Sequence, residues 1–223
     1  MLSGRVYALK TVRLFYKKQG RARYISHLDT MRAMTRMLRR ANLPVWYTEG
    51  FNPHLYVTFA FPLSLGFQSD CEIADIRLTD DGFPTDGICE TLNSTAPDGF
   101  YFFAASKPVK KLSDLSFASF CIEFEDGGNL AAPLEEFLKS DCITVEKKTK
   151  KGGVKTIDIA PDIESYSVEK NGGTTLYITL PAGPAKTLNP ELLIDKFLLE
   201  QGCKPYINIT RTALLDGDKN PLV

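Results

Sequence analysis

His27 and His54 are the only two histidines in the 223-residue chain. Imidazole is the side chain best suited to exchange protons near neutral pH. A ribonuclease that works without a metal needs little more than a general base, a general acid and a cation that binds the phosphate. His27, His54 and Tyr24 are therefore candidates for acid–base catalysis. The alternative is structural: His27 packs at the start of a helix and His54 caps a bend.

Basic side chains crowd the same part of the sequence. Residues 1–48 contain eleven of the 27 Lys and Arg residues and one of the 27 acidic residues, so this segment carries a charge of +10 in a neutral chain. Such an asymmetry indicates a polyanionic partner such as RNA, and a solvated basic surface is the alternative. The predicted nucleic-acid-binding residues are Lys17, Lys18, Arg21, Arg23, Arg32, Arg36, Arg39 and Arg40.

Other kinds of site are not indicated. The two histidines lack the spacing of metal ligands, and the five scattered cysteines form no C-x-x-C motif. Neither of the glycine-rich phosphate-binding patterns is present. We therefore expect that this chain binds no metal and no cofactor. No apolar run approaches the ~20 residues of a membrane span, and the first ten residues lack the apolar core of a signal peptide. We expect a cytoplasmic protein without a membrane partner.

A helix must position most of the arginines. Ser26 is predicted to cap its N-terminus, and Asp29 three residues later completes an aspartate version of the capping box. At about 100° per residue, a helix from His27 to about Ala41 has one apolar face and one basic face. His27 is expected to lean toward the apolar side. The apolar face, predicted to be a core stripe, consists of Leu28, Met31, Met34, Leu38 and Ala41.

The surrounding patterns predict an α+β protein of two tandem ferredoxin-like units. Strands are predicted at 12–17, 45–49, 55–61, 71–78 and 100–106, and a second helix at 84–95. With the second strand long or broken, this order is the βαββαβ arrangement, which places two helices on one face of an antiparallel sheet. A linker is predicted at 107–116, between a basic unit at 1–106 and a second unit at 117–223. The second unit repeats the order and is enlarged by extra hairpins.

Three segments carry a family resemblance, namely RARYISHLD at 21–29, LRRANLPVWYTEGFNPH at 38–54 and FAFPLSLGFQSD at 59–70. Together with ITRTALL at 209–215, they resemble the radical-SAM-linked proteins, a bacterial domain family of unknown function. Members usually read NPHPK where this sequence reads NPHLY at 52–56. Leu55 and Tyr56 thus replace a proline and a base, which weakens a phosphate-binding role for those two positions.

The resemblance implies a partner and a function. Members of that family occur alone or fused to cobalamin-binding radical-SAM enzymes. We therefore expect a non-catalytic accessory module that binds RNA or presents a substrate to a radical-SAM enzyme, in RNA modification or processing. Two alternatives stay open. One is a metal-independent endoribonuclease, because the tandem arrangement is similar to that of CRISPR repeat-processing endoribonucleases. The other is a protein-binding adaptor with a basic face that meets an acidic partner.

Overall fold

The computed structural model describes residues 9–126, 129–148, 152–170 and 172–223. The chain divides into two compact units: unit 1 comprises the residues up to Ser113 together with Val223, and unit 2 comprises Asp114–Leu222. Strand β5 (Leu115–Glu125) therefore begins within the segment predicted as a linker. Most of the segment tested above for a signal peptide, residues 1–8, lies outside the described residues.

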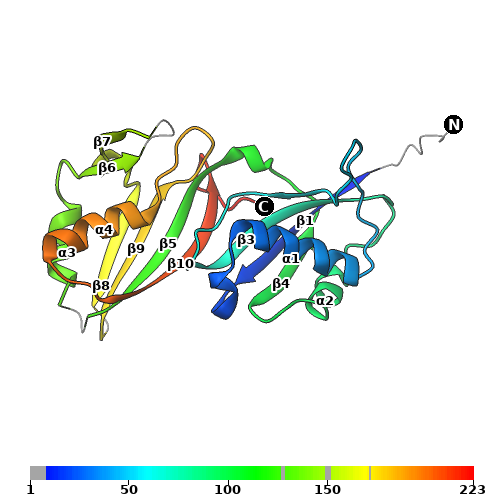
Figure 1. Ribbon diagram of the computed structural model, residues 1–223, viewed down its shortest axis with the longest axis horizontal. Coiled ribbons are helices and arrows are strands. Elements are labelled where there is room, and N and C mark those ends of the chain that lie inside the picture. The colour runs from blue at the N-terminus through cyan, green and yellow to red at the C-terminus, as the bar shows by residue number, and fades with distance from the viewer. Residues whose placement is uncertain (1–8, 127–128, 149–151, 171) are drawn as a thin grey trace. The chain divides into compact units, whose positions relative to one another are not determined.

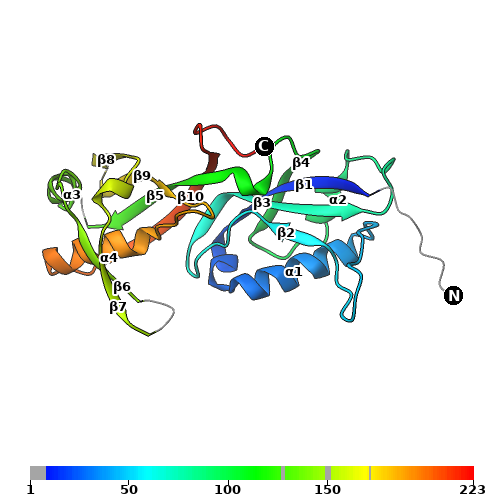
Figure 2. The same cartoon turned by 90° about the horizontal axis from the view of Figure 1, so that it is seen from above.

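Unit 1 combines an antiparallel sheet with two helices (Figures 1 and 2). The strands pair in the order β4-β1-β3-β2, and every pair is antiparallel. The elements follow one another in the predicted order, although the strand predicted at 45–49 is present only as isolated bridges at Val45 and Tyr47. In chain order the elements are β1 (Lys10–Lys18), α1 (His27–Arg40), β2 (Val57–Phe59), β3 (Gln68–Leu78), α2 (Ile88–Asn93) and β4 (Phe100–Ser106).

The core of unit 1 lies between the sheet and its helices. Side chains alternate between the two faces of a strand, so Val12 and Leu14 on β1 point inward and are fully buried. Met34 and Leu38 of α1 belong to the same buried cluster. Figure 2 shows α1 lying along this face of the sheet. The opposite face of the sheet, which carries the intervening residues of β1 and β3, is not covered by α1.

The predicted cap of α1 is confirmed. The Ser26 hydroxyl accepts a hydrogen bond from the Asp29 amide over 3.1 Å and donates to the Asp29 carboxylate over 2.7 Å. This hydroxyl and the neighbouring Arg32 guanidinium stabilise the ionised carboxylate, so the pKa of Asp29 lies below its ordinary value. The first turn of α1 is therefore held by a network of three side chains, Ser26, Asp29 and Arg32.

Ser26→Ala is expected to lower the free energy of unfolding of unit 1 by about 1 kcal/mol, because one N-terminal amide of α1 loses its acceptor. Urea denaturation followed by the fluorescence of Trp46, the only tryptophan of the chain, measures this change. Ser26→Asp keeps an acceptor at the cap and should restore most of the loss. Equal losses in the two variants would contradict the capping role.

In unit 2, four strands pair antiparallel in the order β10-β5-β9-β8. The extra hairpin predicted in this unit is present: β6 and β7 pair with each other as a separate two-stranded ribbon. The turn of this hairpin was predicted at the KKGG sequence of residues 150–153, of which 150 and 151 lie outside the described residues. After β5 the elements are α3 (Ala131–Leu138), β6 (Thr144–Lys148), β7 (Val154–Asp158), β8 (Ser165–Lys170), β9 (Thr174–Pro181), α4 (Pro190–Gln201) and β10 (Tyr206–Asp216).

The mixed α+β class predicted from the sequence is therefore confirmed, and the strands of both units pair antiparallel. Within the described residues, no helix combines the length and the apolar character that a membrane crossing requires.

Candidate nucleic-acid interface

A groove of about 460 Å³ lies between α1 and the segment that runs from His54 through β2. We call it the α1 groove. One side is formed by arginines of α1 and the floor by apolar side chains of both segments, and no acidic residue is among those that line it. The lining residues used below are Leu28, Met31, Arg32, Arg36, Arg39, His54, Val57 and Phe59.

The spacing of the arginines explains why they share one side of the groove. Arg32, Arg36 and Arg39 are four and three residues apart, so they form a stripe along the helix. Arg32 donates to Asp29 over 3.1 Å, and both side chains are more than half exposed. The Arg39 guanidinium lies 5.8 Å from the centre of the Tyr47 ring, within cation–π range. Among the described residues, Arg36 has no ion pair or hydrogen-bond partner for its side chain.

The floor of the groove corrects the predicted core stripe of α1. Met34, Leu38 and Ala41 are buried as expected, but Leu28 is 55% exposed and Met31 is 40% exposed. The apolar arc of the helix is wider than the area that the sheet covers, and these two residues lie at the edge of the arc nearest the arginines. Apolar and cationic side chains are therefore adjacent on a surface that the sequence pattern assigned to the core.

A bend in the chain places His54 at the same groove. The backbone amide of Thr48 donates to the His54 carbonyl over 2.8 Å, and the His54 amide donates to the Thr48 hydroxyl over 3.2 Å. The ring atom Nδ1 lies 3.1 Å from both the Thr48 hydroxyl and the Asn52 carbonyl. These contacts fix the ring through Nδ1 and leave Nε2 as the atom that could meet a ligand.

The other two catalytic candidates are not brought into the groove. His27 is half-buried, and its ring contacts Phe59 edge-on at 5.3 Å between ring centres. This packing agrees with the inward lean predicted for His27. Tyr24 is 66% exposed and is the last residue of a 3-10 helix at Gly20–Tyr24. Of the three candidates, only His54 is among the residues that line the α1 groove with Arg32, Arg36 and Arg39.

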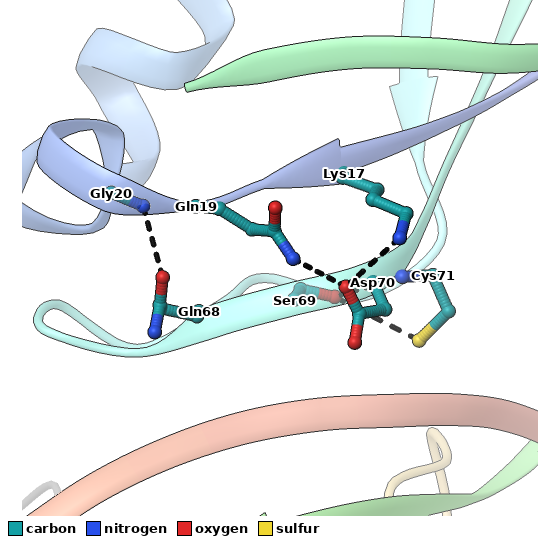
Figure 3. A network of polar contacts seen from close by, with 7 residues as sticks. All are labelled: Lys17, Gln19, Gly20, Gln68, Ser69, Asp70 and Cys71. Carbon is teal, nitrogen blue, oxygen red and sulfur yellow. Dashed lines mark hydrogen bonds and ion pairs between the residues drawn. The ribbon is translucent and has the colours of Figure 1, made fainter.

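The residues before α1 are engaged in a polar network at one end of the sheet (Figure 3). The side-chain amide of Gln19 donates to the Asp70 carboxylate over 2.5 Å, and the Lys17 ammonium lies 3.5 Å from the same oxygen. The Gly20 amide donates to the Gln68 side chain over 2.9 Å. The network holds the 3-10 helix against β3, and Lys17 stays 41% exposed at its edge.

Not every predicted basic residue reaches the surface. Lys18 is only 2% exposed, and its ammonium donates to the Ile25 carbonyl over 3.1 Å. Lys18 follows Tyr16 on the inward face of β1, because the two positions differ by the two-residue period of a strand. Arg23 donates to the Gly66 carbonyl over 2.5 Å. Arg21 and Arg40 are exposed but do not line the α1 groove.

No group of three or more His, Cys, Asp or Glu side chains in the described part of the chain is arranged to hold a metal ion. The five cysteines are free thiols.

Comparison with solved structures shows similarity of fold. A chain of a Cbf5-Nop10-Gar1 complex superposes with a TM-score of 0.51 and 9% sequence identity, over 91% of this chain and 48% of that chain. This chain thus spans about half the length of that one. A proposed glycine cleavage system transcriptional repressor matches at 9% identity with a TM-score of 0.26, over 92% of this chain and 99% of that chain.

No curated protein matches the sequence. One family model does, over residues 11–190, which includes all of the α1 groove and most of unit 2. The chain therefore belongs to the family described as "Uncharacterized protein conserved in bacteria (DUF2344)".

Proposed function

We propose that this chain is an RNA-binding accessory module, that it holds RNA in the α1 groove, and that it serves a radical-SAM enzyme. The observation that carries the RNA part is the stripe of Arg32, Arg36 and Arg39 along a groove that no acidic residue lines. Guanidinium groups bind phosphate oxygens through paired, charge-assisted hydrogen bonds. Three guanidinium groups about one helical turn apart can bind several successive phosphates of one RNA strand.

The state of each arginine supports this role. Because the Arg36 side chain forms no ion pair or hydrogen bond among the described residues, a phosphate can bind it without displacing another group. The pair between Arg32 and Asp29 is exposed, and exposed ion pairs contribute little to stability, so a phosphate can replace the carboxylate at small cost. Tyr47 is 44% exposed and Phe51 is fully exposed in the bend beside the groove. Exposed aromatic rings next to cations are the surfaces on which bases of single-stranded RNA stack.

The radical-SAM part of the proposal is supported by the sequence resemblance described above. A module that binds RNA suits a role in presenting that RNA to a separate enzyme. We place the action of the pair in RNA modification or processing, and the module in the cytoplasm.

We also infer that both units are ferredoxin-like. In unit 1 the order β4-β1-β3-β2 places the fourth strand of the unit beside the first. In unit 2 the order β10-β5-β9-β8 is the same once the ribbon of β6 and β7 is counted as an insertion. The support for this inference is that two segments of different sequence arrive at one strand order, as two copies of a split βαβ unit would.

Anisotropy of a fluorescein-labelled single-stranded RNA tests the RNA-binding proposal. The wild-type chain should bind at about 50 mM salt and lose affinity steeply as salt rises. Replacing Arg32, Arg36 and Arg39 together by Gln should reduce the slope of log K against log salt by about 2, since each neutralised phosphate of a single strand contributes about 0.7. At 0.1 M salt this corresponds to an affinity loss of about 100-fold.

The control removes the same charge from unit 2, by Lys139→Gln, Lys170→Gln and Lys204→Gln, all at exposed positions. It should keep most of the affinity and the slope. Equal losses in the two triple variants would show attraction to net charge alone, and absence of wild-type binding at about 50 mM salt would remove the proposal. If RNA does not bind and a radical-SAM enzyme still co-purifies after nuclease treatment, the protein-binding adaptor is the better description.

A metal-independent endoribonuclease is the second candidate, because His54 lines the groove beside the arginines. Incubation of the same RNA with the pure chain in a chelator separates the two functions. RNA that stays intact supports the binding module. Cleavage that His54→Ala abolishes while RNA binding persists would establish the enzyme instead.

A further inference from the structure

A second pocket lies on the face of the unit 1 sheet that α1 leaves uncovered. Arg13 of β1 and Asp75 and Arg77 of β3 alternate with the buried residues of those strands, so their side chains point away from the core. Together with Tyr56 and residues 107–112 they line a pocket of about 800 Å³. We call it the sheet-face pocket. It shares no lining residue with the α1 groove.

The charge of the sheet-face pocket is strongly positive. Two acidic residues, Asp75 and Asp81, line it, against six basic ones. The resulting charge of +4 is concentrated in a concave surface, where a positive potential attracts anions more strongly than on an open face. The six basic residues are Lys10, Arg13, Arg77, Lys107, Lys110 and Lys111.

Arg13 is a buried cation, and one nitrogen of its guanidinium lacks a hydrogen-bond acceptor within the described part of the chain. Its side chain is fully buried, and Nε and Nη2 donate to the two Asp75 oxygens over 2.8 and 2.9 Å. Among the described residues, Nη1 has no hydrogen-bond partner. A buried donor without an acceptor is costly and is rare in folded proteins. An oxygen atom of a bound anion would supply the missing acceptor.

Arg77 forms a rigid second cation beside Arg13. Its guanidinium lies 4.2 Å from the centre of the Tyr56 ring and 5.8 Å from that of Trp46. Stacking on aromatic rings uses the face of the guanidinium and leaves its N–H groups at the edge for hydrogen bonds. No ion pair or side-chain hydrogen bond of Arg77 is present among the described residues. Its donors are therefore oriented in advance.

We propose that the sheet-face pocket binds a nucleoside phosphate, with the phosphate groups toward Arg13 and Arg77. The volume is far larger than a single phosphate requires and lies in the range of pockets that enclose small organic ligands. The stacked Arg77 offers a planar surface on which a base can continue the stack. The phosphate comes either from a free nucleotide or from the phosphorylated end of an RNA strand. This proposal does not depend on RNA binding in the α1 groove.

Isothermal titration calorimetry with ADP tests the site on the full chain. Wild-type chain should bind ADP, and Arg77→Gln should weaken binding by about 10- to 100-fold, the contribution of a hydrogen bond to a charged group. Arg77 is preferred to Arg13 for this test because Arg13 is part of the buried ion pair. Lys204→Gln, an exposed position in unit 2, removes the same charge and should leave ADP binding unchanged.

Two further titrations identify the ligand. A preference for 5′-phosphorylated over 5′-hydroxyl RNA that Arg77→Gln abolishes would assign the pocket to strand ends, whereas ADP binding without such a preference would assign it to free nucleotides. Inorganic phosphate that binds as tightly as ADP would overturn the nucleoside part of the proposal. The whole proposal fails if neither ADP nor 5′-phosphorylated RNA shows binding that depends on Arg77. Loss of RNA affinity in the α1-groove variant is a separate result and does not bear on this one.

Discussion

Asp75→Ala is expected to lower the free energy of unfolding of unit 1 by about 3–5 kcal/mol, which is the cost of leaving a buried charge without its partner. Arg13 is fully buried, and two of the three nitrogens of its guanidinium donate hydrogen bonds to Asp75. Removal of the carboxylate leaves the whole buried guanidinium without a hydrogen-bond partner among the described residues.

Urea denaturation followed by Trp46 fluorescence reports on this change, since Trp46 and the ion pair both belong to unit 1. Lys17→Ala is the matched control: it breaks an ion pair with Asp70 on the same strand, but one in which both side chains are more than one third exposed. The control should cost less than about 1 kcal/mol. Replacing the pair by Arg13→Met and Asp75→Leu should recover most of the stability. A loss below about 1 kcal/mol in Asp75→Ala would show that Arg13 is not isolated from solvent.

The elements of unit 1 were predicted well where their formation depends on a single local pattern, such as strand alternation or helix capping. The alternation of Val12, Leu14 and Tyr16 identifies the inward face of β1, and the structure buries all three. The cap at Ser26 was predicted because a hydroxyl followed by a carboxylate three residues later satisfies the first amides of a helix. These signals depend on residues close together in the sequence, so they do not require knowledge of the tertiary structure.

The site depended on contacts that local patterns do not encode. Arg13 and Asp75 are 62 residues apart, and only the register of β1 against β3 makes them partners. The alternation that places Tyr16 on the inward face of β1 also places Lys18 there. Lys18 was nevertheless predicted to bind nucleic acid, because that prediction considered its charge and not its position in the strand. His54 reaches the α1 groove through a bend whose geometry depends on hydrogen bonds to Thr48. The sequence signal for the groove was present in the arginine stripe; its apolar floor was not recognised.

The apolar arc of α1 leads to the second large prediction. Leu38→Ala is expected to lower the free energy of unfolding of unit 1 by about 2–5 kcal/mol, because Leu38 is fully buried and its loss leaves a cavity between α1 and the sheet. Met31→Ala removes a side chain of similar size from the same predicted stripe. It should change the stability by no more than about 0.5 kcal/mol, because Met31 is 40% exposed at the groove.

The contrast between these two variants tests the placement of the α1 groove independently of any ligand. Both are measured by urea denaturation with Trp46 fluorescence, and alanine favours the helix in both, so propensity does not separate them. Similar losses for Leu38→Ala and Met31→Ala would mean that the whole apolar arc is covered, which would close the groove and remove its floor. A large loss confined to Leu38→Ala means that Met31 lies outside the packed core of unit 1. An exposed apolar side chain beside Arg32 and Arg36 then belongs to the floor of the α1 groove, the surface proposed to bind RNA.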